Sequence, residues 1–163
     1  MNLFKVPRRQ YIPPYESVYR DSREIEGKKI AGLLMGASAI SVQKWYQLAA
    51  LDISEECKEL PDHIAMELGY LAHLCQKEQG FAATGDDARL TRTLEMERDF
   101  LAGHLAVWIG LLRDGINEKS RHSYFRAVSE LAEQFVRSDL TTLESVLGPS
   151  EGCADPRYAA TGS

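Results

Sequence analysis

The placement of proline is the feature that most constrains how this chain can fold. The six prolines stand at positions 7, 13, 14, 61, 149 and 156, and none lies between Asp62 and Gly148. Because proline breaks the interior of a helix, that stretch can be helical throughout. Leucine and alanine total 36 residues, against 15 for valine and isoleucine, which favours helix over strand. The chain is therefore predicted to be all-α.

Apolar spacing predicts helices at roughly 38–51, 61–80, 87–114 and 120–137, and a last short helix capped by Asp139. The second helix is expected to end at Gly80, followed by a loop over 81–86. The third is apolar on nearly every side between Phe100 and Leu112, with a break expected near Thr93. A helix that is apolar all round usually lies at the centre of a bundle.

The fourth predicted helix has an apolar stripe made of Tyr124, Val128, Leu131 and Phe135, which we expect to be buried. The segment 1–36 is expected to be irregular, and the tail 150–163 to be loose. No internal repeat or second core is evident. The prediction is a single helical bundle domain over residues 1–149.

Size and charge exclude several classes of protein. The 163 residues carry a formal net charge of −5, so a nucleic-acid binder is not expected. No apolar run approaches the ~20 residues needed to span a bilayer. Arg8 and Arg9 are not followed by the apolar region of an export signal, and the three cysteines show no CxxC spacing. These features predict a cytoplasmic protein without membrane insertion.

Motifs that carry catalysis are missing from the sequence. There is no Glu-x-x-His pair, no His-Glu-x-x-His zinc motif, no Gly-x-Ser-x-Gly elbow and no phosphate-binding loop. The sequence alone therefore supplies no catalytic constellation, and neither a metal site nor a cofactor is expected.

Acidic residues gather in one stretch of sixteen residues that is opposed only by Lys58. They are Asp52, Glu55, Glu56, Glu59, Asp62 and Glu67. One interpretation is a solvated acidic loop with a capping aspartate. The other is an acidic rim for a basic peptide, where complementary charge raises encounter rate and specificity.

Several polar and aromatic residues also admit two interpretations. His63, Glu67 and Tyr70 share one helical face, and His104 lies between Leu101 and Trp108 on another. A histidine on an apolar stripe is either a hydrogen-bonded core residue or a functional one. The aromatic set either fills the core or lines a groove for an apolar peptide; it consists of Tyr11, Tyr15, Tyr19, Trp45 and Tyr46.

Three sequence blocks resemble one known family. They are Pro-Pro-Tyr-Glu-Ser-Val-Tyr at 13–19, Leu-Pro-Asp-His-Ile-Ala-x-Glu-Leu at 60–68, and Phe-Leu-x-x-His-Leu-x-x-Trp at 100–108. Their order and spacing resemble those of the TorD/DmsD/NarJ family, the assembly chaperones of molybdenum-containing oxidoreductases. The resemblance runs from about Leu3 to Asp139.

The resemblance implies an all-helical cytoplasmic chaperone of the TorD-like type, without catalytic turnover. Such proteins bind the twin-arginine leader and the apo form of a molybdopterin oxidoreductase catalytic subunit, aid cofactor insertion and delay export. The family's Asp and His, implicated in client binding, map onto Asp62 and His63, whose side chains we expect to face solvent or a groove.

The remaining site residues are assigned around that pair. Client contacts are expected from Glu59, Glu67, Tyr70 and Tyr15. Groove support is expected from Trp45, Tyr46, His104 and Trp108, with the indole N–H of Trp108 needing a polar partner.

Three points stay open at this stage. Relatives typically have one or two helices ahead of the Pro-Pro-Tyr block, where this chain has twelve residues, which leaves room for a homodimer. One alternative function is a helical interaction module without an exported client. Another is a small nucleotide-binding enzyme.

Overall fold

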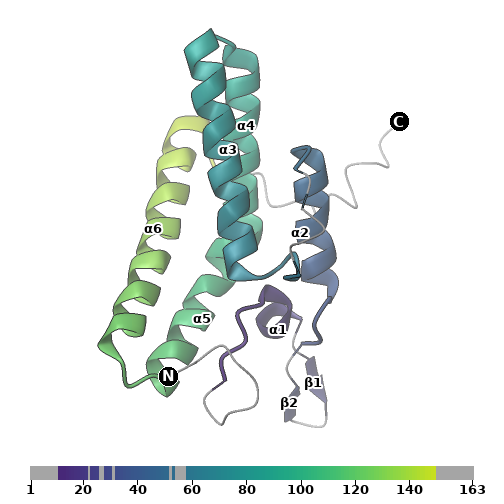
Figure 1. The fold of residues 1–163 in the computed structure, drawn as a ribbon, viewed down its shortest axis with the longest axis vertical. Helices are drawn as coiled ribbons and strands as arrows, with labels where there is room; N and C mark the ends of the chain where they lie inside the picture. The colour runs from purple at the N-terminus through teal and green to yellow at the C-terminus, as the bar shows by residue number, and fades with distance from the viewer. Residues whose placement is uncertain are drawn as a thin grey trace.

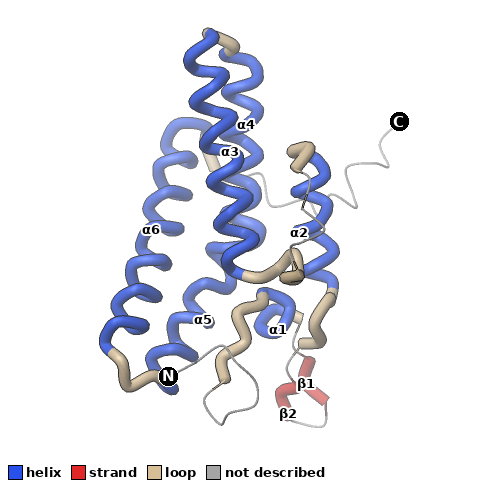
Figure 2. The backbone as a smooth tube through the Cα atoms, viewed as in Figure 1, coloured by secondary structure: helices blue, strands red, loops and turns tan. Residues whose placement is uncertain are grey.

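The structure is a computed structural model that describes residues 11–21, 23–25, 28–30, 32–51, 53 and 58–149. It confirms the all-α class: the regular structure of the described residues is helical, apart from one short antiparallel hairpin in which Arg23 lies opposite Ile30 (Figures 1 and 2). The elements in chain order are α1 (Glu16–Arg20), β1 (Arg23–Ile25), β2 (Lys28–Ile30), α2 (Ala37–Leu48), α3 (Ile64–Thr84), α4 (Asp87–Phe100), the π-helical turn η1 (Leu101–Leu105), α5 (Ala106–Lys119) and α6 (Ser123–Leu147).

The α3–α4 hairpin corrects one predicted boundary. Helix α3 continues past Gly80 to Thr84 and ends because Gly85 adopts a left-handed φ of 68°. Asp86 then caps α4, its carboxylate accepting the N–H of Arg89 at 3.1 Å. The expected loop over 81–86 is therefore mostly helix, and the turn is only two residues long.

The central helical segment, made of α4, η1 and α5, is longer than the predicted third helix, and its departure from α-helical geometry lies at a different place. Helices α4 and α5 run on through η1 as far as Lys119, and the departure from α-helix falls at 101–105 rather than near Thr93. Phe100, Leu101 and Leu105 are fully buried. This agrees with the expectation that the most apolar helix is central.

Helix α6 contradicts two predictions. It is one helix, so Asp139 lies in its interior and caps nothing. Its predicted buried stripe is exposed, and its buried face carries Ser129, Val136 and Leu143 instead. The physical reason is close approach to α5. A Cβ at Gly110 would lie only 3.1 Å from the Glu133 carboxylate.

The core has two parts. The larger cluster joins α2, α3, α4 and η1 with contributions from α6, and it includes Trp45, Tyr46 and Tyr70. The smaller one packs Ile12 against Trp108, Leu112 and Ile116 of α5. The N-terminal segment thus rests on α5 rather than standing apart as irregular chain.

Two glycines let the segment around α1 pack closely. A Cβ at Gly32 would lie 1.9 Å from the carbonyl oxygen of Ser17, and one at Gly36 would lie 2.1 Å from the Asp21 carboxylate. That carboxylate accepts the N–H of Ser38 at 3.1 Å and its hydroxyl at 2.9 Å. Asp21 therefore caps α2 from a neighbouring segment. The expected tail 150–163 lies outside the described residues.

Candidate functional site

The Pro-Pro-Tyr and Leu-Pro-Asp-His blocks are joined by backbone hydrogen bonds into one unit. The N–H of Glu16 donates to the carbonyl of Asp62 at 3.0 Å, and the N–H of Ile64 donates to the carbonyl of Pro14 at 2.9 Å. Tyr15 and His63 form the bridge between these bonds. Two segments far apart in the sequence therefore share one surface, at the foot of α3 in Figure 1.

Asp62 is fully buried beneath this surface, which corrects the expectation that its side chain faces solvent or a groove. One carboxylate oxygen accepts the N–H of Ser17 at 2.9 Å. Helix α1 has no side-chain cap of its own, so Asp62 caps it from the other block. The second oxygen has no hydrogen-bond partner among the described residues.

His63, by contrast, is partly exposed and caps α3. Its Nδ1 accepts the N–H of Ala65 at 3.0 Å, and its ring meets Tyr15 edge-on at 5.2 Å between centroids. Its Nε2 lies 4.0 Å from the carboxylate of Glu59, which also accepts the Tyr15 hydroxyl at 3.2 Å. We call these three residues the Tyr15–Glu59–His63 cluster. Burial lowers the pKa of His63, although Glu59 and Asp62 oppose that change.

A buried polar network lies behind the cluster. The Glu16 carboxylate is 2.8 Å from Nδ1 of His104, and Arg20 binds both Glu16 and the carbonyl of Gly103, at 2.5 and 2.6 Å. The other ring nitrogen of His104 lies 3.3 Å from the Ser41 hydroxyl. Helix α1 is thereby tied to η1 through the His104 side chain and the carbonyl of Gly103.

Glu67 connects the network to α5. The indole N–H of Trp108 donates to one Glu67 oxygen at 3.1 Å, and this is the polar partner that the buried indole requires. Burial raises the pKa of Glu67 well above its usual range, and the nearby charge of Glu16 adds to this, whereas the bond from Trp108 opposes it. The protonated form of Glu67 is therefore favoured.

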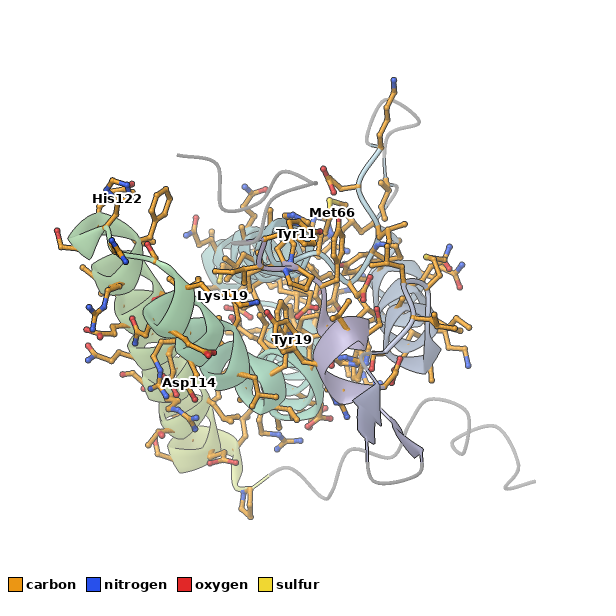
Figure 3. All side chains as sticks on the ribbon, turned by 90° about the horizontal axis from the view of Figure 1, so that it is seen from below. Tyr11, Tyr19, Met66, Asp114, Lys119 and His122 are labelled. Carbon is orange, nitrogen blue, oxygen red and sulfur yellow. The ribbon has the colours of Figure 1, made fainter. Side chains whose placement is uncertain are left out.

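Aromatic rings fill the space beside Glu67. Tyr70 packs against Phe100 at 4.6 Å and against Tyr46 at 5.1 Å between centroids. The Tyr46 hydroxyl donates to the carbonyl of Pro61 at 2.7 Å. This bond fixes the backbone just ahead of Asp62. Figure 3 shows Tyr19, which stacks on Trp108, on the α1 side of this core.

The structure divides the predicted site residues into two groups. The first group is at least partly exposed to solvent and consists of Tyr15, Glu59 and His63. The others are buried: Asp62, Glu67, Tyr70, Trp45, Tyr46, His104 and Trp108. The acidic residues Asp52, Glu55 and Glu56 lie outside the described residues. Their part in an acidic rim, and the role of every site residue in client binding, stay predictions.

Sequence reasoning missed Glu16 and Arg20. Glu16 belongs to the Pro-Pro-Tyr block and Arg20 follows it directly. Their partners His104 and Gly103 are 88 and 83 residues away. A glutamate in the first turn of a short helix normally signals only a favourable helix dipole. Nothing in the local pattern indicates a buried ion pair.

One group of metal-ligand type stands apart from this site. Cys75, Glu78 and Glu97 bring their ligand atoms within 4.8 Å of one another. The Cys75 thiol donates to Glu97 at 3.4 Å. Burial raises the pKa of Glu97 to about 8 and that of Cys75 to about 12. Burial also raises the pKa of Glu78, although a hydrogen bond with Glu97 opposes this change, and one Glu78 oxygen, Oε1, has no hydrogen-bond partner among the described residues.

Comparison with known proteins gives a consistent set of relatives. The model of the nitrate reductase delta subunit family matches residues 1–114. The chaperone protein TorD of Shewanella pealeana is 28% identical over 145 residues, covering 89% of this chain and 59% of the relative. TorD of Vibrio cholerae O395 is 25% identical over 146 residues, covering 90% and 61%. The selenate reductase assembly chaperone protein of Thauera selenatis is 35% identical over 92 residues, covering 55% and 47%.

The chain spans about three fifths of the length of the TorD relatives that it matches. Among solved structures there is no significant match. Within the described residues, no helix is both long and apolar enough to cross a membrane.

Proposed function

The chain belongs to the nitrate reductase delta subunit family, which is the TorD/DmsD/NarJ family, and on that premise we propose that it is a system-specific assembly chaperone. Its client is the catalytic subunit of a molybdopterin-containing oxidoreductase. It binds the twin-arginine leader and the apo form of that subunit, aids cofactor insertion and delays export. Relatives named as TorD and as selenate, chlorate and perchlorate reductase assembly chaperones support this proposal.

The observation that carries the proposal is the joining of the two sequence blocks around the Tyr15–Glu59–His63 cluster. A twin-arginine leader presents two guanidinium groups, which carboxylates bind through paired, charge-assisted hydrogen bonds. Glu59 exposes half of its side chain beside two rings, and rings offer an arginine both stacking and cation–π contact. We assign Glu59 to the arginines, with Tyr15 and His63 flanking it.

The buried residues have a different task in this proposal. Asp62 and Glu67 position the surface, because they hold α1 and α5 against the loop that carries Glu59 and His63. Tyr70, Trp45, Tyr46, His104 and Trp108 support that arrangement from the core. These residues act on the client through the backbone they fix.

The protein works by binding rather than by turnover, and in the cytoplasm, where a leader must be met before export. The relatives' names as chaperones support the first point. The alternative function is a helical interaction module without an exported client. A search for the client distinguishes this alternative from the proposal. A homodimer stays a prediction and is not needed for client binding.

A peptide titration tests the proposal. The probe is a synthetic leader with two adjacent arginines ahead of about fifteen apolar residues, followed by fluorescence anisotropy at low and high salt. Glu59→Gln should weaken binding by about tenfold, in line with the loss of one charge-assisted pair. Asp87→Asn is the matched control, because Asp87 is exposed at the far tip of the α3–α4 hairpin.

A second peptide with lysines in place of the arginines checks the geometry, since lysine cannot form the paired bonds. The lysine peptide should bind the wild-type protein more weakly than the arginine peptide does. The two peptides should bind Glu59→Gln about equally. Equal losses in Glu59→Gln and Asp87→Asn would show a general charge effect and sink the assignment of Glu59.

A further inference from the structure

A small pocket lies where the end of α2 meets the α3–α4 hairpin, and we call it the α2–α4 pocket. It has a volume of about 160 Å³, and more than half of the residues that line it are apolar. These apolar residues are Leu48, Ala49, Leu74, Phe81 and Met96. In Figure 1 the pocket lies beside the upper end of α2, whereas the Tyr15–Glu59–His63 cluster lies at the foot of α3. The pocket is therefore separate from the site described above.

The volume of the α2–α4 pocket suits one side chain of a partner. An apolar cavity of about 150 Å³ accepts a benzene-sized molecule. Ala49 and Leu74 are 4% and 1% exposed and form a closed apolar floor, whereas Leu48 is 61% exposed and offers an apolar surface that an incoming side chain can cover. The pocket therefore has room for a phenylalanine ring or a branched side chain of similar size.

Every charged residue that lines the α2–α4 pocket is a cation, although the whole chain has a formal net charge of −5. The three cations are Lys77, Arg89 and Arg92. Nζ of Lys77 donates to the carbonyl of Ala49 at 2.6 Å, which holds the ammonium group at the pocket and uses one of its three N–H donors. The guanidinium group of Arg89 lies 5.8 Å from the centre of the Phe81 ring, in a cation–π contact. The structure thus places positive charge directly beside apolar surface.

The acidic neighbours of the two arginines leave this charge available to a ligand. Arg89 pairs with Asp86 at 3.3 Å and Arg92 pairs with Glu95 at 3.4 Å, and the arginine side chains are 71% and 72% exposed. Exposed ion pairs of this kind contribute little to stability. Each guanidinium group has five N–H donors, so it can bind a further carboxylate without losing its neighbour.

We propose that the α2–α4 pocket binds an acidic peptide segment of another protein. One aromatic or branched apolar side chain of the segment enters the pocket, and carboxylates on either side of it bind Lys77, Arg89 and Arg92. Charge complementarity selects this occupant, because the same three cations repel the arginines of a leader. The proposal goes beyond the proposed chaperone function and does not depend on it.

Isothermal titration calorimetry of the full chain at low salt, at two temperatures, tests the proposal. The probe is a synthetic peptide with one central phenylalanine and three glutamates on each side. Replacing the phenylalanine with alanine should weaken binding about tenfold, because the pocket stays empty. Replacing the glutamates with glutamines should weaken binding by at least as much, and high salt should weaken the original peptide several-fold.

Two pairs of variants locate the binding surface on the protein. Arg92→Glu should weaken binding at least tenfold, whereas Arg121→Glu, the same change of charge at an exposed residue just ahead of α6, should leave it unchanged. Leu48→Ser should weaken binding several-fold, whereas Leu131→Ser, at a leucine that is 66% exposed on α6, should not. All four residues are exposed, so the circular dichroism spectra should match that of the wild type.

The leader peptide separates this inference from the proposed function. Glu59→Gln should bind the acidic peptide as the wild type does, and Arg92→Glu should bind the leader peptide as the wild type does. Loss of acidic-peptide binding alone would leave the chaperone proposal intact, and loss of leader binding alone would leave the α2–α4 pocket intact.

Four results would overturn the inference. The first is an acidic peptide that does not bind at about 1 mM and low salt. The second is equal weakening by Arg92→Glu and Arg121→Glu, which would show a general charge effect. The third is equal binding of the phenylalanine and alanine peptides, which would leave the pocket without an occupant. The fourth is a sedimentation mass above that of one chain that Leu48→Ser lowers, which would make the pocket a contact between copies.

Discussion

Replacing Glu67 with glutamine should raise the free energy of unfolding relative to that of the wild type, and the difference should grow as the pH rises. Glutamine keeps the shape of the side chain and an oxygen that can accept the Trp108 indole N–H, which now lies 3.1 Å from Glu67. It cannot ionise. The wild-type carboxyl is fully buried and lies close to Glu16, and both conditions disfavour its charged form.

The sign and size follow from linkage between protonation and folding. Because the pKa of Glu67 is higher in the folded protein, the folded state binds more protons than the unfolded state above about pH 4.5. The contribution of Glu67 to wild-type stability therefore falls by about 1.4 kcal/mol per pH unit from there until its folded-state pKa is reached. The difference in free energy of unfolding between Glu67→Gln and wild type should grow at that rate.

Urea melts of both proteins at half-unit steps from pH 4 to pH 8 measure this difference. Other groups with raised pKa values, such as Glu97 with a pKa of about 8, titrate in both proteins. Their contributions therefore cancel in the difference between the two free energies of unfolding. Glu67→Ala serves as a comparison, because it leaves the Trp108 indole unpaired and should cost about 1–3 kcal/mol at every pH. A Glu67→Gln difference that stays flat over the whole range would refute the buried titration.

Three further outcomes are expected in melts at pH 7. Asp62→Ala should lower the free energy of unfolding by about 1–2 kcal/mol because the first turn of α1 loses its cap, whereas Asp62→Asn should keep most of it; equal losses would contradict the capping role. His104→Leu should cost about 1–3 kcal/mol, since the buried Glu16 carboxylate loses its imidazole partner and keeps only Arg20, and a loss under ~0.5 kcal/mol would contradict this. Gly32→Ala should destabilise by about 1–3 kcal/mol through its clash with α1, while Gly80→Ala, where nothing lies near the added methyl group, should gain up to about 1 kcal/mol.

The helical class and the central position of the helical segment made of α4, η1 and α5 could be predicted because they depend on local facts. A long interval without proline permits helix, and apolar residues on every side of residues 100–112 require burial. The end of α3 could not be placed, because both Gly80 and Gly85 are compatible with a stop. Only the left-handed φ of Gly85 distinguishes them.

The errors in the site and in α6 share one cause, which is dependence on distant segments. Asp62 was expected at the surface, and it is buried because the first turn of α1, 45 residues earlier, needs its carboxylate. Periodicity found the apolar stripe of α6 at Leu131 and its neighbours, but it cannot tell whether the same chain covers that stripe. Close approach at Gly110 selected the other face.

The bond between Glu16 and His104 also fixes the order of events during synthesis. The two residues are 88 positions apart, and ribosomes add about 5–20 residues per second, so Glu16 leaves the ribosome roughly 4 to 18 s before its partner. Helix α1 has only five residues and no side-chain cap of its own, so it cannot hold its shape during that interval. The N-terminal segment is therefore the first part of the described chain to be made, but it cannot dock until η1 and α5 have emerged, and Ile12 stays exposed to water until α5 covers it.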